Sequence, residues 1–305
     1  MNRACFNQNT TKHKRSHERS ELNPHEQNQY ACIRPIKNNF VRMKSIRIVM
    51  FGAGNVGTHL TRALWNRGYQ IVQVYSRTEK SAKLLADEVQ AMPITNPADF
   101  DTSSDAVIFA LNDSILAEII KQVDISGQLA LHTSGSISID VFKGRADHYG
   151  VLYPLQTFSK SRQLHFQDIP LFIEANGPSQ LANLKMLASS IAAKVILADS
   201  LQRRQLHLTA VFASNFVNHM YALTLELGKK YGFSFEIFEP LILETTLKAI
   251  ESRNPMEVQT GPAVRKNKEI ILKHIEMLDT EPDLQNLYTF VTNSILKLHY
   301  KEVFS

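Results

Sequence analysis

Short apolar runs alternate with amphipathic segments between residues 46 and 199. Such runs are typical of buried parallel strands, and apolar residues at helical spacing between them indicate helices. We expect strands at 46–51, 71–75, 106–111, 128–132, 150–153, 170–174 and 194–197. We expect the intervening helices at 56–67, 81–89, 115–123 and 181–192. This alternation predicts an α/β fold with a doubly wound parallel sheet.

The pattern changes at residue 199, after which only helical periodicity remains. Helices are expected at 201–231, 235–252, 262–278 and 283–301, with prolines punctuating them. The expected organisation is therefore a leader at 1–43, a sheet domain at 44–199 and an all-α domain at 200–305.

Charge is distributed unevenly along the 305 residues, of which 44% are hydrophobic and 21% charged. The formal net charge is +5. Eight of the 34 basic residues and three of the 29 acidic residues lie in 1–42, so the rest of the chain carries 26 of each and no net charge. Because nucleic-acid binding needs a basic surplus, we expect no nucleic-acid partner for the folded part.

The leader is rich in Asn, Gln, His and Lys, and its few apolar residues predict disorder. It lacks the apolar run of a secretory signal. A targeting role is one reading; we prefer translation from Met43, which leads directly into the first strand. Both cysteines, Cys5 and Cys32, lie in the leader, so we expect no disulfide framework and no metal site in the folded part. A cytoplasmic protein is predicted.

A glycine-rich loop follows the first strand and precedes the first helix. It consists of Gly52, Ala53, Gly54, Asn55, Val56 and Gly57. Its first glycine allows a tight turn, its second lets the backbone approach a pyrophosphate, and its third lets helix and strand pack closely. The helix N-terminus then offers N–H donors to the anion. This context predicts a dinucleotide-binding Rossmann domain; a glycine turn that binds nothing is the alternative.

The end of the second strand suggests which dinucleotide is bound. An NAD site usually has an acidic residue here for the ribose hydroxyls, but this chain has Ser76, Arg77 and Thr78. A guanidinium flanked by hydroxyls suits a 2′-phosphate, so we predict NADP(H). The alternative is that Arg77 is simply solvated.

Two later strand ends are expected to face the same cofactor, because ligands bind beyond the carboxyl ends of parallel strands. Leu111 and Asn112 follow one strand, and Thr133 and Ser134 follow the next. Small and hydroxyl residues there allow close approach by the nicotinamide ribose. The alternative is that Ser134 or Asp113 only caps a helix.

The first helix of the second domain has no charged residue from 205 to 225, yet its Asn and His content argues against a membrane span. Its other faces are apolar, so we expect it to be buried. A polar stripe on it holds the candidate catalytic residues His207, Asn215, Asn218 and His219. A histidine could donate a proton to a carbonyl or imine that receives hydride, and an asparagine could orient it. Satisfied core residues are the alternative.

Five motifs in order support a family resemblance. They are Phe51–Gly57, His132–Ser136, Tyr153–Phe158, Ala213–His219 and Thr260–Pro262. Together they resemble the Rossmann-like proteins with a DUF2520 domain, which are labelled NADP-dependent oxidoreductases. The family is similar in plan to pyrroline-5-carboxylate reductase and the 6-phosphogluconate dehydrogenase superfamily, and the resemblance covers residues 44–300.

The resemblance implies an active cleft between a Rossmann domain and a helical domain, and a homodimer built through the helices. The lysine and asparagine pair of the superfamily's hydroxyacid dehydrogenases is missing, since Lys229 and Lys230 lie beyond the polar stripe. Two hypotheses remain: an NADP(H)-dependent oxidoreductase acting on a small carbonyl or imine, and a protein that binds or senses a dinucleotide without turning it over.

Overall fold

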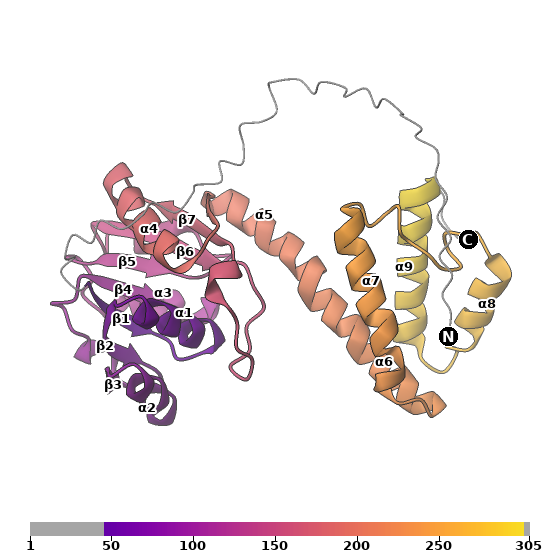
Figure 1. Ribbon diagram of the computed structural model, residues 1–305, viewed down its shortest axis with the longest axis horizontal. Coiled ribbons are helices and arrows are strands. Elements are labelled where there is room, and N and C mark those ends of the chain that lie inside the picture. Colours follow the sequence, from indigo (N-terminus) through magenta and orange to yellow (C-terminus); the bar gives the residue numbers. More distant parts are fainter. Residues whose placement is uncertain (1–45, 302–305) are drawn as a thin grey trace, which may run out of the picture. The chain divides into compact units, whose positions relative to one another are not determined.

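The computed structural model describes residues 46–301, which form an eight-stranded sheet followed by a series of helices (Figure 1). The predictions made for the leader, including Met43 as the natural start and the placement of both cysteines, lie outside these residues. None of the helices between residues 46 and 301 has the length and apolar character needed to cross a membrane.

The sheet has the strand order β3-β2-β1-β4-β5-β6-β7-β8. The chain order changes direction between β1 and β4, which is the switch point of a doubly wound sheet. The strands are β1 (Arg47–Phe51), β2 (Gln70–Tyr75), β3 (Met92–Ile94), β4 (Ala106–Phe109), β5 (Leu129–His132), β6 (His148–Pro154), β7 (Leu171–Ala175) and β8 (Val195–Leu197). The predicted α/β class is confirmed.

Two features of the sheet differ from the expectation. β3 has only three residues, one of them Pro93, and so gives no apolar run for the sequence to reveal. β7 pairs antiparallel with β6, whereas an all-parallel sheet was expected. The 16 residues that join β6 to β7 contain only a short 3₁₀ turn, Phe166–Asp168, and no crossover helix. Without a crossover helix the chain returns beside the strand it has just left.

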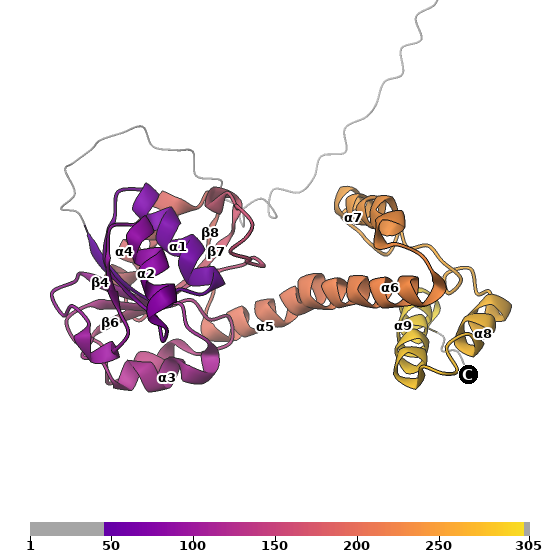
Figure 2. The same ribbon diagram turned by 90° about the horizontal axis from the view of Figure 1, so that it is seen from below.

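Helices cover both faces of the sheet because alternate residues of its central strands point to opposite sides (Figure 2). Ile48 and Met50 of β1 pack with α1 (Asn55–Asn66), α2 (Glu79–Glu88) and α4 (Pro178–Ile191). Val49 and Phe51 pack with α3 (Asp113–Lys121) and Phe142. The glycine loop at the end of β1 is therefore held by a strand that is buried on both faces.

A long helical rod leaves the sheet after β8 and runs continuously through α5 (Ser200–Ala210), a π-helical stretch (Val211–Phe216) and α6 (Val217–Tyr231) (Figure 2). The rod agrees with the helix expected at 201–231, apart from the π-helical stretch. A π-helix bonds residue i to i+5, so it rotates the side chains that follow it relative to those of a regular α-helix.

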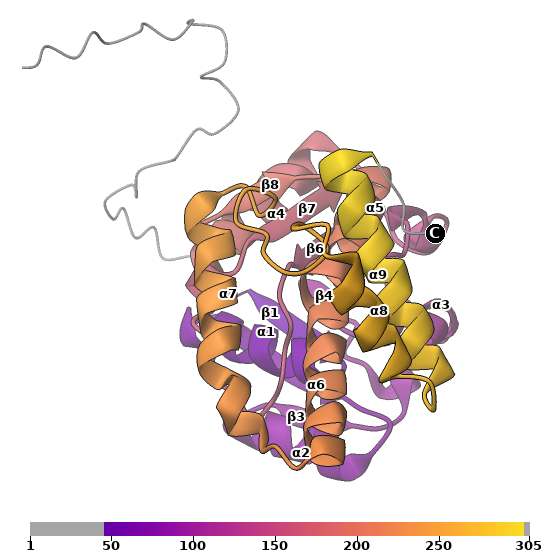
Figure 3. The same ribbon diagram turned by 90° about the vertical axis from the view of Figure 1, so that its right-hand side faces the viewer.

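Three further helices follow, and they face the viewer in Figure 3: α7 (Glu239–Ser252), α8 (Lys268–Glu276) and α9 (Pro282–Tyr300). α8 and α9 are joined by a hydrogen bond of 2.8 Å between His274 Nδ1 and the Tyr288 hydroxyl. The end of α6 is tied to the turn before α9 by Lys230, which pairs with Glu281.

The expectation that the rod is buried is wrong for the single chain. Phe212 is 62% exposed, and the apolar residues Leu208, Phe216 and Met220 are also exposed. After residue 200 the only buried hydrophobic residues of the described chain are Ala263, Ile271, Leu278 and Leu296. The apolar faces are therefore present as the sequence indicated, but nothing in the described chain covers them.

Candidate functional site

Four parallel strands end at the same edge of the sheet. Phe51 of β1 lies beside Phe109 of β4, and Phe109 lies beside His132 of β5. His132 in turn lies beside Val151 of β6. The segments that follow these strands therefore come together at one edge, which is where such sheets bind ligands.

The glycine loop closes tightly against β2 and β4. The Gly52 N–H donates to the Tyr75 carbonyl at 2.9 Å, and Gly52 has a φ of 119°, which favours glycine. A Cβ on Gly52 would lie 2.2 Å from the Ala110 carbonyl oxygen, and a Cβ on Gly57 would lie 1.9 Å from the Gly52 carbonyl oxygen. Both glycines are thus required for the fold of the loop itself.

Gly54 is different, because a Cβ at this position would meet nothing within 4 Å. Gly54 is the N-cap of α1, and no side chain caps this helix. No acidic residue lies in its first turn. The helix start therefore offers N–H donors and open space to an anion, as a bound pyrophosphate requires. Of the remaining loop residues, Ala53 is buried, Asn55 is exposed and Val56 is half-buried.

The polar residues after β2 lie next to this loop, since Gly52 is bonded to the last residue of β2. Arg77 and Thr78 are exposed, and Ser76 is half-buried. The Arg77 guanidinium makes no hydrogen bond or ion pair with any other residue between 46 and 301, and the Thr78 side chain does not cap α2. A cation flanked by two hydroxyls is thus available to a phosphate at the edge of the loop.

The residues after β4 and β5 take part in local structure. Asn112 is the N-cap of α3, because its side chain accepts from the Ser114 N–H at 3.1 Å. The Ser134 hydroxyl accepts from the N–H groups of Ser136 and Ile137 at 3.0 Å each. Ser134 therefore accepts backbone hydrogen bonds much as a capping residue does, which agrees in part with the alternative that it only caps a helix. The N-cap of α3 is Asn112 and not Asp113. Leu111 is half-buried and Thr133 is buried, and both follow strands that end at this edge of the sheet.

His132, the last residue of β5, is a completely buried neutral histidine. Its Nδ1 accepts from the Ser134 N–H at 3.1 Å, and its Nε2 has no hydrogen-bond partner of good geometry in the described chain. Burial, followed by the charge of Arg203, lowers the pKa of His132 to about 3, although the Ser138 carbonyl acts in the opposite direction. A neutral ring here fixes the start of the 133–137 loop.

Of the predicted catalytic residues, His207 is the one that lies at this edge. Its Nδ1 is 3.1 Å from the hydroxyl of Tyr153 near the end of β6. A Cβ on Gly135 would lie 2.8 Å from the same Nδ1, so the glycine lets the imidazole lie directly on the loop after β5. Sequence reasoning did not select Tyr153 or Gly135, because their contact with His207 joins segments far apart in the chain.

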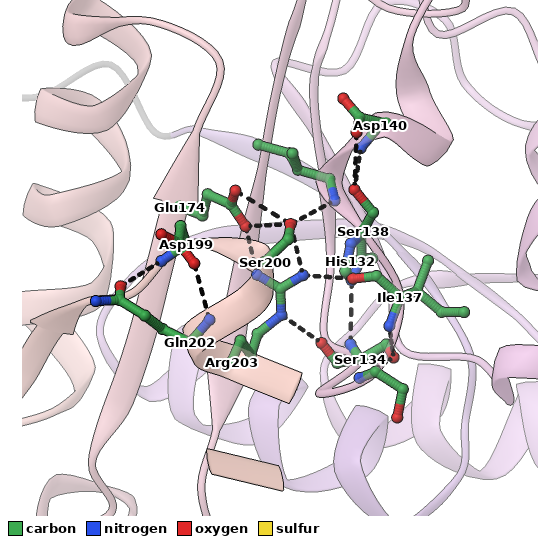
Figure 4. Close-up of polar contacts among 12 residues, drawn as sticks. His132, Ser134, Ile137, Ser138, Asp140, Glu174, Asp199, Ser200, Gln202 and Arg203 are labelled. Atoms are coloured by element: carbon green, nitrogen blue, oxygen red, sulfur yellow. Dashed lines mark hydrogen bonds and ion pairs between the residues drawn. The ribbon is translucent and has the colours of Figure 1, made fainter. Parts of the chain in front are cut away.

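A buried arginine, also missed by sequence reasoning, fixes α5 to the same loop (Figure 4). Arg203 has no exposed surface. Its Nε donates to the Ser134 carbonyl at 3.1 Å, and its Nη2 donates to the Ile137 carbonyl. Its Nη1 pairs with Glu174 of β7, whose carboxylate also accepts from the Ser200 hydroxyl at 2.8 Å. In sequence, this arginine looks like one more charged residue at the start of a helix.

The other three predicted catalytic residues lie farther along the rod. Asn215, Asn218 and His219 are all exposed. His219 is twelve residues beyond His207, which corresponds to about 18 Å along a helix. It lines a cavity of about 950 Å³ between α6 and the start of α9. Four of the charged residues of that cavity form two ion pairs, Lys229 with Glu226 and Lys230 with Glu281.

Comparisons with known proteins agree with this architecture. A family model described as a Rossmann-like domain matches residues 33–156, and a domain of unknown function, DUF2520, matches residues 169–295. The structure of BF3122 from Bacteroides fragilis, provisionally described as an NADP oxidoreductase, is 46% identical, with a TM-score of 0.79. The match covers 83% of this chain and 98% of that one.

The chain belongs to this Rossmann-like, DUF2520 family. More distant structures share the fold. TM1727 from Thermotoga maritima is 18% identical with a TM-score of 0.70, over 84% of this chain and all of that one. A reductive aminase from Aspergillus terreus, in complex with NADPH and ethyl-5-oxohexanoate, is 15% identical with a TM-score of 0.60, over 84% of this chain and 93% of that one. No protein with a curated description matches the chain.

Proposed function

We propose that this member of the DUF2520 family is an NADP(H)-dependent oxidoreductase that transfers hydride to or from a small carbonyl or imine. The observation that carries the proposal is the uncapped start of α1, with open space at Gly54 and, beside it, Arg77, whose guanidinium has no partner among residues 46–301. A pyrophosphate at the helix start would place the 2′-phosphate side of the cofactor towards β2. Its nicotinamide side would then lie towards β4, β5 and β6.

The relatives support the same assignment. BF3122, at 46% identity, is described as an NADP oxidoreductase, and the more distant reductive aminase is in complex with NADPH and a keto ester. When bound, the nicotinamide supplies or accepts the hydride. This chain's residues would hold the phosphates, shape the substrate site beside the loop after β5, and move a proton to or from the substrate heteroatom.

The polar stripe on the rod is part of the proposal. His207 lies beside Tyr153, on the side of the edge proposed for the nicotinamide, and this position would suit a role in proton transfer. Asn215, Asn218 and His219 lie too far along the same helix to act with His207 on one small substrate, unless a second chain brings them to its site. Their predicted catalytic role is thus proposed together with a dimer.

We propose a homodimer formed through the helical domain, residues 200–305, in which the exposed apolar residues of the rod and α7 are covered by a second copy. Leu241, Leu243 and Ile250 of α7 are each more than half exposed, as are Leu208 and Phe212 of the rod. Exposed apolar surface of this extent on a helical layer is typical of an interface. We also propose that the chain divides at residue 199 into a Rossmann domain and a helical domain. A cytoplasmic location is proposed as well.

The test is NADPH consumption, measured at 340 nm against a panel of ketoacids, aldehydes and cyclic imines, with NADH in parallel. We expect oxidation of NADPH with at least one class and much slower oxidation of NADH. Absence of turnover together with tight NADPH binding would instead favour the second hypothesis, a protein that senses the dinucleotide. Absence of both turnover and NADPH binding would contradict both hypotheses.

A further inference from the structure

The pairing of Tyr153 with His207 carries an inference beyond the residues chosen from sequence. Tyr153 extends β6 two residues past Val151, which lies beside His132 at the end of β5. Val151 and Leu152 have no exposed surface, whereas Tyr153 retains 8%. The phenol therefore lies at the carboxyl edge of the sheet, on the side proposed for the nicotinamide.

The surroundings of the Tyr153 hydroxyl are few and well defined. His207 Nδ1 of α5 is its hydrogen-bond partner at 3.1 Å. The charges of Arg203 on α5 and Asp113 at the start of α3 act on it in opposite directions, and the Arg203 charge is partly balanced by Glu174. Burial, the larger influence, raises the pKa of Tyr153, so the phenol keeps its proton at neutral pH.

The hydrogen bond between the two side chains has two forms. The phenol can donate to Nδ1, or a protonated Nδ1 can donate to the phenol oxygen. Only in the second form is the phenol hydrogen free to point at a substrate. In that form the imidazole also stabilises the negative charge that develops on the phenol oxygen as its proton leaves.

We propose that Tyr153 is the catalytic residue that gives the proton to the substrate heteroatom, and that His207 is a positioning residue that acts through it. The inference rests on the proposed oxidoreductase function. In the reducing direction the substrate carbon receives the hydride from NADPH, the phenol O–H bond breaks, and a new O–H or N–H bond forms on the substrate. The proton on His207 Nδ1 then passes to the phenol oxygen, and His207 regains a proton from water. Oxidation is the reverse.

Gly135 gives an independent way to test the role of His207. Its backbone has no positive φ, so alanine is allowed there, but an added Cβ would lie 2.8 Å from Nδ1 and 3.0 Å from the His207 Cβ. The imidazole must therefore move, although neither partner of the pair has been deleted. Gly127 is the matched control, since a Cβ there meets nothing within 4 Å and its φ is also not positive.

The experiment compares the full-length wild type with Tyr153→Phe and Gly135→Ala, and with the controls Tyr149→Phe and Gly127→Ala. Tyr149 lies four residues earlier on β6, at the opposite end of the strand. Three quantities are measured for each protein. They are kcat with NADPH and a substrate from the panel, the Kd of NADPH, and the ¹⁵N NMR chemical shift of His207 Nδ1. The His207 signal is assigned by its loss in His207→Gln.

We expect Tyr153→Phe to lower kcat about 100-fold or more, and Gly135→Ala to lower it at least tenfold, with the Kd of NADPH within threefold of wild type in both. The Nδ1 shift should change in both variants, and the two controls should resemble wild type in every measurement. A wild type that turns over while Tyr153→Phe loses less than tenfold in kcat would overturn the role of Tyr153 alone. An unchanged Nδ1 shift in Tyr153→Phe would overturn the pairing. A wild type without turnover would overturn the proposed function, and this role with it.

Discussion

Arg203 of α5 forms an ion pair with Glu174 of β7, and the arginine is completely buried. The same guanidinium donates to the carbonyls of Ser134 and Ile137, so one side chain holds the first turn of the rod, an inner strand and the loop after β5. A buried charge costs free energy unless it is paired and hydrogen-bonded, and here both conditions are met. The arginine therefore orders the loop after β5, against which the His207 imidazole packs.

Arg203→Ala should lower the free energy of unfolding by about 3–5 kcal/mol, because Glu174 and two carbonyls lose their donor inside the protein. Chemical denaturation followed by circular dichroism measures this. Arg204→Ala is the control: Arg204 is the exposed neighbour, and its loss should change the free energy by less than about 0.5 kcal/mol. Similar losses in both variants would show that the network contributes little.

Gly54→Ala and Gly57→Ala should separate cofactor binding from folding. Gly54 has a φ of −79° and open space around its Cα, so alanine should leave the melting temperature within about 2 °C of wild type. It should still raise the Kd of NADPH about tenfold or more, because a methyl group enters the space of the pyrophosphate. Gly57→Ala should destabilise the fold itself, since the new Cβ overlaps the Gly52 carbonyl. NADPH titration and thermal melts give both quantities. Unchanged NADPH affinity in Gly54→Ala would argue that the anion lies elsewhere.

Arg77→Ala should weaken NADP(H) binding by about 1–3 kcal/mol, the loss of one charge-assisted bond, and leave NAD(H) binding nearly unchanged. Isothermal titration with both cofactors measures the difference. Arg67→Ala provides a matched control, because Arg67 is an exposed arginine at the far end of α1. Equal losses for NADP(H) and NAD(H) would mean that Arg77 does not hold the 2′-phosphate.

His132 should make stability depend on pH. Its folded pKa of about 3 lies below the ordinary value of 6.5, so below pH 6.5 the unfolded chain binds a proton that the folded chain does not. This contribution to stability is complete above pH 6.5 and is lost as the pH falls towards 3. Between pH 7 and pH 5 the free energy of unfolding should fall by about 2 kcal/mol on this account, at most about 1.4 kcal/mol per pH unit.

The pH dependence is checked by urea unfolding at both pH values in wild type and His132→Asn. Asparagine offers an oxygen in the place of Nδ1 to the Ser134 N–H but does not titrate. The variant is expected to be less stable at pH 7 and to lose less stability on acidification. His148→Asn, which changes an exposed histidine of β6, should keep the wild-type pH dependence. The same pH dependence in His132→Asn as in wild type would rule out His132 as its source.

Phe212→Asp should convert the proposed homodimer into a monomer, because it places a charge among the exposed apolar residues of the rod. Light scattering coupled to gel filtration gives the mass of each species. Leu84→Asp on α2 is the control, since Leu84 and Phe212 are both 62% exposed and Leu84 lies on the Rossmann domain. A wild type that elutes as a monomer would contradict the proposed dimer.

The local elements were largely predictable because each one has its own sequence signal. The strand at β1 is an apolar run ended by Gly52, and the rod follows from its helical periodicity. β3 and the direction of β7 were not predictable in this way. β3 is too short to show a periodic pattern of apolar residues. The direction of β7 depends on whether a crossover helix joins it to β6.

The residues proposed to hold the cofactor could be singled out from the sequence for the same reason. Its glycine loop and Arg77 occupy consecutive stretches of chain, where spacing alone carries the information. On the side proposed for the substrate, the sequence singled out only His207. Tyr153, Gly135 and Arg203 acquire their significance from contacts across more than 50 residues of sequence, which no local pattern records.

By itself the sequence determined the α/β class, the position of the glycine loop and the apolar faces of the helices, because these depend on periodicity and on residue type at fixed spacing. Only the tertiary structure decided which polar residues meet at the edge of the sheet. It brought His207 to Tyr153, buried Arg203 beside Glu174 and left Phe212 exposed. Such encounters depend on how the strands are ordered and where the rod leaves the sheet, and those are properties of the packed chain rather than of any one segment.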